Sequence, residues 1–154
     1  MSPRDKVNAW LRELTPSGSS LFALDEHGLC LLADEQETVL AIQIPENSTE
    51  VYLHSKIAPP PQENSGDLLS DLLKANYLCL ETRGTTLAMD QDGNIVLCYT
   101  VPVEGLDFTG FGNLLGEFLE TRDHWVQRLS QPPSGKRDKP TNTEVLISAT
   151  DIRV

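Results

Sequence analysis

The chain has 154 residues, of which 39% are hydrophobic and 23% are charged, and its formal net charge is −11. These values predict one soluble globular domain with a single core, and no apolar run approaches the ~18 residues that a membrane helix needs. The charge argues against direct nucleic-acid binding, because an acidic body repels phosphate backbones.

The charge is unevenly distributed along the chain. Residues 131–154 carry a net charge of +1, so the rest of the chain carries −12. Such an acidic body suits a basic or apolar protein partner. The N-terminus has no apolar segment after its basic residues, so we expect no secretory signal and a cytoplasmic protein. The spacing of Cys30, Cys79 and Cys98 fits neither a disulfide framework nor a zinc site, and we interpret these cysteines as small core residues.

The first expected helix begins at Ser2-Pro3-Arg4-Asp5, which combines a serine cap, proline at the first position and an acid three residues after the cap. Val7, Trp10, Leu11 and Leu14 follow at the spacing of one apolar helix face. Thr15 to Gly18 ends this helix.

A block of short strands is expected next. Residues 21–25 alternate weakly, 29–33 are continuously apolar, and 38–44 and 50–57 alternate well, with turn residues between them. Leu40, Ile42 and Ile44 share one face of their strand. The pattern predicts an antiparallel meander of three or four strands. We expect Cys30, Leu32, Val39 and Ala41 on the opposite face, under a helix or a partner.

The proline-rich stretch 58–64 is an extended connector, and the helix after it is the most apolar of the chain. Ser65 is its expected cap, and Leu68, Leu69, Leu72 and Leu73 form its stripe. Four leucines give an eleven-residue helix more apolar surface than it buries easily alone. It therefore needs a partner surface, in this chain or in a second copy.

A hairpin and a long helix complete the expected domain, which covers residues 1–130. Asp92-Gly93 predicts a tight turn with two positive-φ residues. The helix runs over 108–129, is capped by Asp107 or Thr109, and contains Gly112 and Gly116. Because each glycine costs about 1 kcal/mol relative to alanine, we expect both to pack closely on the sheet. We expect 131–154 to be a flexible tail, with a short terminal strand at 144–150 as an open possibility.

The motifs that would carry chemistry fail in detail. Asp90, Asp92 and Asn94 have calcium-loop spacing, but Ile95 stands where the loop needs glycine and Val101 where it needs glutamate. Gly110-Phe111-Gly112 lacks the surrounding parallel unit of a dinucleotide site. The three histidines show no metal-ligand spacing. The sequence therefore predicts a protein that is not an enzyme and has no cofactor or metal.

The order helix, three or four strands, helix, hairpin, long helix resembles the class I chaperones of bacterial type III secretion, the Tir chaperone (CesT-like) family. The resemblance covers about residues 4–130 as a loose consensus rather than one motif. It rests on Leu24-Asp25-Glu26-His27-Gly28, Leu32-Ala33-Asp34-Glu35, Leu68-Leu69, Leu72-Leu73-Lys74-Ala75-Asn76, Leu87-Ala88-Met89-Asp90, Phe118-Leu119 and Trp125. It implies an α+β fold with a twisted antiparallel sheet and three helices, assembled as a homodimer.

The resemblance also implies two binding surfaces and one class of partner. The second copy would contact the middle helix and the following hairpin, and a secreted effector would lay its N-terminal segment, in extended form and without ATP, into surface grooves. The dimer residues would be Leu68, Leu69, Leu72, Leu73, Ile95 and Leu97, or the opposite parity Val96 and Cys98. The effector residues would be Trp10, Leu14, Leu32, Val39, Ala41 and Tyr52, unless these are ordinary core.

Two other functions remain open. Some regulatory members of this family look similar around 25–37 and in ending near an Arg-Val, so one alternative is an adaptor that sequesters a transcriptional anti-activator. The second is a small ligand-binding α+β domain, which requires a concave polar pocket for which the sequence offers no convergent residues.

Overall fold

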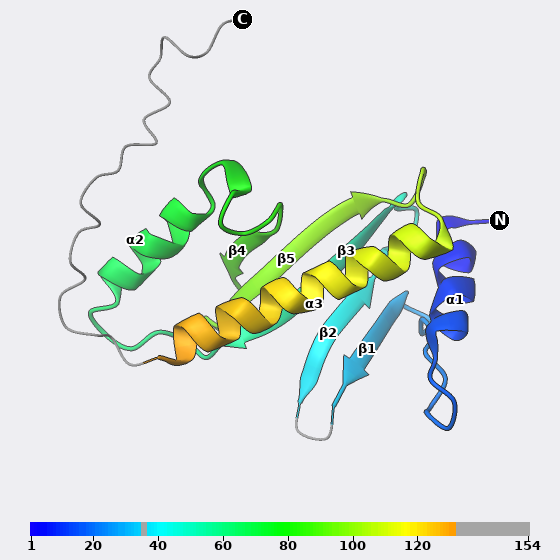
Figure 1. Ribbon diagram of the computed structural model, residues 1–154, viewed down its shortest axis with the longest axis horizontal. Coiled ribbons are helices and arrows are strands. Elements are labelled where there is room, and N and C mark those ends of the chain that lie inside the picture. Colours follow the sequence, from blue (N-terminus) through cyan, green and yellow to red (C-terminus); the bar gives the residue numbers. More distant parts are fainter. Residues whose placement is uncertain (35–36, 132–154) are drawn as a thin grey trace, which may run out of the picture.

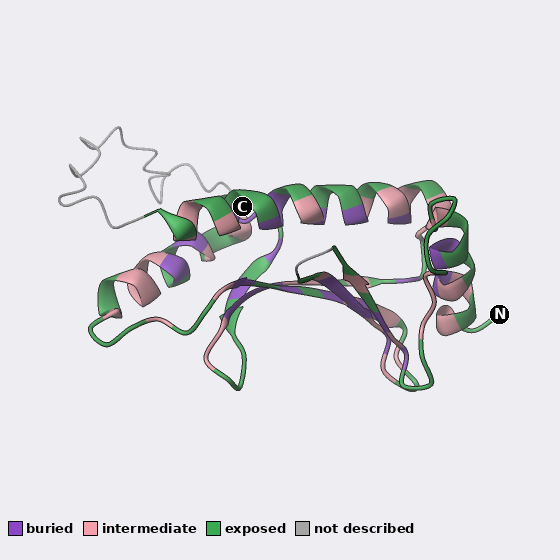
Figure 2. Ribbon diagram, turned by 90° about the horizontal axis from the view of Figure 1, so that it is seen from below, coloured by how far each residue is buried: buried purple, intermediate pink, exposed green. Residues whose placement is uncertain are grey.

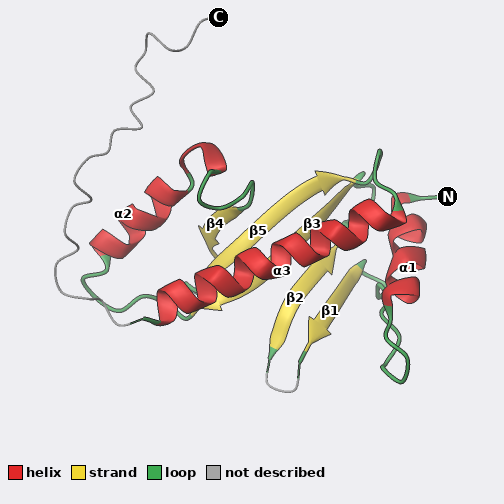
Figure 3. Cartoon of the chain, viewed as in Figure 1, coloured by secondary structure: helices red, strands yellow, loops and turns green. Residues whose placement is uncertain are grey.

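The computed structural model describes residues 1–34 and 37–131. Its elements are α1 (Pro3–Leu14), β1 (Leu29–Ala33), β2 (Thr38–Gln43), β3 (Glu50–Ala58), α2 (Gly66–Ala75), the short 3-10 helix η1 (Tyr77–Cys79), β4 (Thr86–Met89), β5 (Ile95–Pro102) and α3 (Phe108–Ser130). The expected α+β architecture is confirmed (Figure 3). The expected linker and terminal strand beyond residue 131 lie outside the described residues.

The five strands form one antiparallel sheet in the order β1-β2-β3-β5-β4. α3 crosses one face of the sheet, α1 lies at its β1 end, and α2 lies beside β4 at the other edge (Figure 1). None of the described elements covers the opposite face (Figure 2). No helix among the described residues is long and apolar enough to span a membrane.

Local hydrogen bonds determine where α1 and α3 begin. Ser2 and Asp5 form the expected capping box of α1, in which each side chain accepts from the other residue's backbone N–H. At α3 the Asp107 carboxylate accepts the N–H of Gly110 at 2.7 Å, so Asp107 rather than Thr109 is the cap. Such caps are each worth about 1 kcal/mol.

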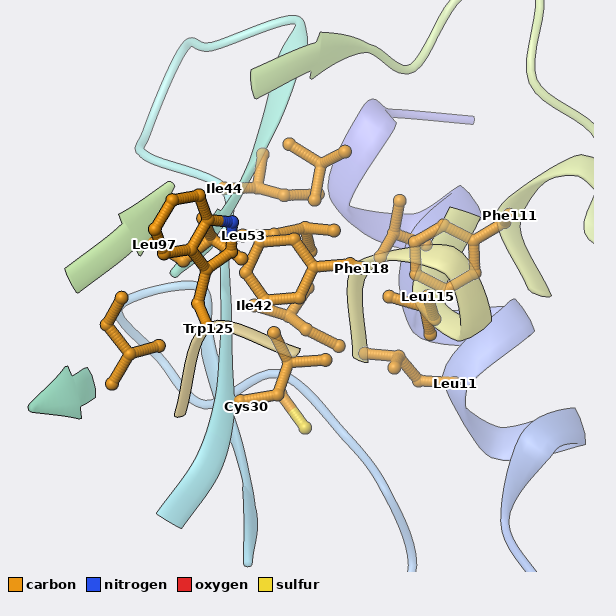
Figure 4. Close-up of a cluster of buried hydrophobic side chains, with 14 of the residues drawn as sticks. Leu11, Cys30, Ile42, Ile44, Leu53, Leu97, Phe111, Leu115, Phe118 and Trp125 are labelled. Atoms are coloured by element: carbon orange, nitrogen blue, oxygen red, sulfur yellow. The ribbon is translucent and has the colours of Figure 1, made fainter. Parts of the chain in front are cut away.

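The core lies between α3 and the covered face of the sheet. Phe111, Leu115, Phe118 and Trp125 of α3 are all buried. Phe118 and Trp125 lie near Leu53 of β3, whereas Phe111 lies toward Leu11 of α1 (Figure 4). Burial of side chains of this size stabilises the fold by about 1.5–3 kcal/mol each. This packing fixes the orientation of the sheet, and therefore decides which strand residues face away from α3.

Several local expectations are wrong. Residues 21–25 form no strand, because the backbone N–H groups of Phe22 and Leu24 bond to the side chains of Thr15 and Asn8 instead. Ser65 precedes α2 but its side chain makes no capping hydrogen bond.

The turn between β4 and β5 is also wider than a two-residue hairpin. Of its residues only Gly93 has a positive φ. The Asp90 carboxylate accepts the N–H groups of Asp92 and Asn94, which closes a longer loop. Asp92 therefore does not adopt the left-handed conformation that the Asp-Gly pair predicted.

The predicted face is correct for Val39 and Ala41 of β2, which lie on the uncovered face, but wrong by one residue in β1. Cys30 pairs with Ile42 and Leu32 with Leu40, so both lie on the covered face. Leu29 and Leu31 take the uncovered face. The continuous apolar run in β1 hides its parity, since alternation is the only signal of side-chain direction.

The helix glycines of α3 also differ from expectation. A Cβ at Gly112 would approach the Leu14 side chain of α1, at 3.9 Å, and one at Gly116 would meet nothing within 4 Å. Neither glycine is required by close packing on the sheet.

Candidate partner-binding surfaces

The outer side of α2 and the segment after it form an exposed apolar surface of the described chain. Four of the eight exposed large apolar side chains fall between residues 73 and 80. With Leu69 they form what we call the α2 patch: Leu69, Leu73, Tyr77, Leu78 and Leu80. Leu73 is 72% exposed, while its neighbour Leu72 is 7% exposed and packs inward. A contiguous apolar patch of this kind is typical of a protein interface.

The patch is also hollowed. An open depression of about 660 Å³ lies along α2, lined by Gly66, Leu69, Ser70, Leu73, Lys74 and Tyr77. Its lining is mainly apolar, with Lys74 as the only charged residue among those six. The shape and chemistry suit an apolar ridge, such as a helix face, rather than a polar ligand.

Backbone strain accompanies this surface. Leu78 and Cys79 are consecutive non-glycine residues with φ of 56° and 53°. Left-handed residues of this kind cost of order 1–3 kcal/mol each and persist only where their surroundings hold them. Here the N–H of Cys79 donates to the Asn76 carbonyl and the N–H of Gly84 to the Cys79 carbonyl. The segment is thereby held in a conformation that leaves Leu78 exposed.

The residues expected at a dimer interface separate into two groups. Leu68 and Leu69 are half-buried and Leu73 is exposed, so α2 does present part of its stripe to solvent. Ile95 and Leu97 are buried on the covered face of β5, where Leu97 lies beneath Trp125 (Figure 4). On the opposite parity of β5, Val96 is buried and Cys98 is half-buried.

The residues expected to hold an effector also lie on separate surfaces. Trp10 is buried, with its ring centroid 5.2 Å from that of Phe111, and Leu14 is half-buried beside it. Leu32 is half-buried on the covered face. Val39, Ala41 and Tyr52 lie on the uncovered face, where Ala41 is buried among its neighbours. These six residues therefore lie on more than one surface of the described domain.

The uncovered face of the sheet is a mixed apolar and polar surface. One row across it reads Leu31, Ala41, His54, Cys98 and Thr86, and the next reads Leu29, Gln43, Tyr52 and Thr100. Leu31 is 55% exposed and is the large apolar residue that sequence reasoning missed on this face. The sequence of the turn at residues 25–28 does not predict which side chains of β1 face the uncovered side of the sheet.

A second depression, of about 360 Å³, lies between α3 and β5 and bears on the ligand-binding alternative. It is lined by Arg83, Thr85, Tyr99, Leu114, Glu117, Phe118, Glu120 and Thr121. The hydroxyls of Thr85 and Thr121 already donate to the carbonyls of Thr82 and Glu117. Arg83 and Glu120 pair with each other at 3.9 Å. Much of the polar lining is thus already partnered within the chain, so this depression does not favour the ligand-binding alternative.

The pKa shifts of Cys30, Cys98 and Asp25 fit structural rather than catalytic roles. Burial raises the pKa of the Cys30 and Cys98 thiols, which makes both poor nucleophiles. Hydrogen bonds from the Leu29 N–H and other backbone groups lower the pKa of the turn carboxylate of Asp25. In the described part of the chain no three His, Cys, Asp or Glu side chains gather as a metal site would require.

Comparison with known proteins gives one family and several similar structures. The model of the Tir chaperone protein (CesT) family matches residues 15–126. A sequence search of curated proteins found no match.

Among solved structures, a chain of the ExsC–ExsE complex is similar with a TM-score of 0.71 and 20% identity, covering 87% of this chain and 100% of that one. The HopA1–SchA chaperone–effector complex gives a TM-score of 0.59, 18% identity and coverage of 80% and 91%. The Yersinia pestis type III secretion chaperone SycH in complex with a YscM2 fragment gives 0.56, 14%, and 80% and 99%. At these identities the likeness establishes the fold.

Proposed function

The chain belongs to the Tir chaperone protein (CesT) family, and on this basis we propose that it is a type III secretion chaperone. It binds the N-terminal segment of one or a few secreted effectors in extended form and keeps them soluble and secretion-competent without ATP. The observation that carries the proposal is the family match over residues 15–126. The fold shared with chains of chaperone complexes supports it. No catalytic step is involved, and the site of action is the bacterial cytoplasm.

The chaperone acts as a homodimer in this proposal, with the α2 patch as the contact between copies. The patch supplies a contiguous apolar surface that the described chain leaves open, and a self-complementary surface is what two-fold symmetry requires. Leu69 and Leu73 would lie at its centre, with Leu68 and Leu72 packing behind them. Ile95 and Leu97 would support the hairpin from within, since neither has exposed surface.

The effector segment is proposed to bind over the other end of the molecule. Half-buried Leu14 is the last residue of α1, and half-buried Leu32 lies in β1. Val39 and Tyr52 lie on the uncovered face. An extended chain that wraps from one to the other would bury its apolar side chains in sequence. Because these side chains are then already removed from water, the bound segment has little tendency to collapse or aggregate.

A regulatory role remains the alternative function. In this alternative the chain is a chaperone that also sequesters a regulatory protein. The similarity to a chain of the ExsC–ExsE complex, which spans the whole of that chain, is compatible with it. In either role we place the folded domain at residues 1–130 and treat 131–154 as a tail.

The test is a comparison of secreted proteins with and without this chain under conditions that induce secretion. We expect one or a few proteins to disappear from the supernatant, to co-purify with the chaperone, and to be protected from protease over an N-terminal segment only. An unchanged set of secreted proteins, together with stoichiometric binding of a cytoplasmic regulator, would favour the regulatory alternative instead.

A further inference from the structure

The sheet has two edge strands, β1 and β4, and they differ in how many of their outward-facing backbone groups are hydrogen-bonded. An edge strand exposes a row of N–H and C=O groups that another chain can pair with, and proteins close such edges to prevent unwanted association. In β4 the outward-facing groups at the centre of the strand belong to Leu87, because Thr86 and Ala88 pair toward β5. The next outward residue along the strand is Met89.

Asn76 closes the β4 edge with its side chain. Its Nδ2 donates to the Leu87 carbonyl at 2.9 Å, and its Oδ1 accepts the Leu87 N–H at 2.8 Å. The amide thus makes the same two bonds that a residue of a sixth strand would make. Asn76 is itself fixed at the end of α2, where its N–H donates to the Leu72 carbonyl and its carbonyl accepts from Cys79.

The β1 edge receives only part of this protection. At its first outward residue, Leu29, the N–H donates to the Asp25 carboxylate and the carbonyl accepts the Asp25 N–H, both at 2.9 Å. At the next outward residue, Leu31, nothing in the described ranges makes an equivalent pair of bonds. Leu31 also has a half-exposed side chain.

We propose that Asn76 is the residue that keeps β4 from pairing with another chain. The occupant that it excludes is β4 of another copy. α2 contacts β4, so the α2 patch and the β4 edge lie side by side. With a second copy already seated on the patch, an open β4 would form an antiparallel pair with β4 of a further copy, so the assembly would grow beyond its native size. The position of the second copy rests on the proposed function, whereas the closure of β4 does not.

The first test measures the closure directly, by amide hydrogen exchange followed by NMR on the full chain. We expect the Leu87 amide to exchange about tenfold more slowly than the Met89 amide, since both point outward and, among the residues that the structure describes, only Leu87 has a partner for its N–H. Equal exchange at the two positions in the native protein would overturn the proposal, whatever its oligomeric state.

The second test opens the edge. Asn76→Ala should bring Leu87 exchange close to that of Met89 and raise the solution mass above that of the native protein, increasingly so with concentration. Asn76→Asp keeps an acceptor for the Leu87 N–H and places a charge on the edge, but it loses the bond to the Leu87 carbonyl. We therefore expect Leu87 exchange slower than in Asn76→Ala, and the native mass. Asn113→Ala, an exposed asparagine of α3, is the control for loss of an amide and should change neither.

The third test separates pairing through β4 from general association of a destabilised chain. Ala88→Lys places a lysine on the β4 edge, and in combination with Asn76→Ala it should return the mass to the native value. An Asn76→Ala protein that keeps the native mass at all concentrations would contradict the proposal. So would an enlarged mass that Ala88→Lys fails to reduce. If Asn76→Ala does not fold, the native exchange rates and Asn76→Asp decide.

Discussion

Arg122 provides the sharpest test of how α3 is fixed to the sheet. Its side chain is only 10% exposed, and its Nε donates to the Ser55 hydroxyl at 3.1 Å. Ser55 donates in turn to the Val39 carbonyl at 2.6 Å, so the chain of bonds runs from α3 through β3 to β2. The outer nitrogens bond to Glu37 at 3.0 Å and Asp123 at 2.9 Å.

The size of the effect follows from which partner is buried. Arg122→Ala removes a charged hydrogen bond to a buried hydroxyl and leaves a cavity where the stem packed, so we expect a loss of about 2–4 kcal/mol in unfolding free energy. Glu37 is 61% exposed and regains water when its partner is lost. Glu37→Gln should therefore cost less than about 1 kcal/mol, and less still at high salt.

The assay is urea unfolding of Arg122→Ala, Arg122→Met and Glu37→Gln, with midpoints compared at an unchanged m-value. Arg122→Met keeps most of the packing and loses the hydrogen bonds, so its stability should fall between the native protein and Arg122→Ala. If Glu37→Gln destabilised the protein as much as Arg122→Ala, the surface pair rather than the Ser55 bond would fix α3. If Arg122→Met matched the native protein, the bond would contribute nothing.

Three further predictions concern α2 and two turns. Leu72→Ala should lower the free energy of unfolding by about 2–5 kcal/mol, because Leu72 is buried. Leu73→Ala should change the free energy of unfolding of the monomer by less than about 0.5 kcal/mol, but it should weaken self-association. Equal effects of the two variants in urea unfolding would refute the assignment of Leu72 to the inside and Leu73 to the outside of α2. Gly28→Ala should cost at least about 1–3 kcal/mol, because φ is +78° and a Cβ would collide with the Ile44 carbonyl, and a native thermal midpoint would contradict this. The pKa of Asp90 is lowered below 3.8, chiefly by the hydrogen bond from the Asn94 side chain. The ionised Asp90 carboxylate therefore stabilises the fold above its unfolded-state pKa, and this stabilisation is lost as the pH falls through its folded-state pKa. The stability difference between the native protein and Asp90→Asn should therefore be constant above about pH 5 and shrink below 3.8, and a difference that grew in acid would reverse the assignment.

Local signals allowed most of the elements to be predicted from sequence. The capping box at Ser2 and Asp5 places the start of α1, and the alternation of Leu40 and Ile42 identifies the covered face of β2. The apolar spacing of α3 predicted a helix over 108–129, and the structure ends it at Ser130. Each of these signals lies within one helix or one strand, where spacing alone determines side-chain direction.

The remaining features depend on pairings between distant residues. The side of β1 that faces α3 follows from its register with β2, and nothing within its apolar run specifies that register. Asn76 closes an edge strand 11 residues away in the chain, and Arg122 reaches Ser55 across 67. The α2 stripe was visible in the sequence, but its division into buried Leu72 and exposed Leu73 depends on where β4 lies beside it.

The most direct test of the account is the mass of the purified full chain in solution, measured by light scattering at micromolar concentration. A homodimer through the α2 patch predicts about 34 kDa, twice the 17.0 kDa of the chain. It also predicts a return to 17.0 kDa for Leu73→Glu but not for Asn113→Glu, which adds the same charge on α3. A native protein that stays at 17.0 kDa throughout this range would contradict the dimer, and would leave the α2 patch to a different partner.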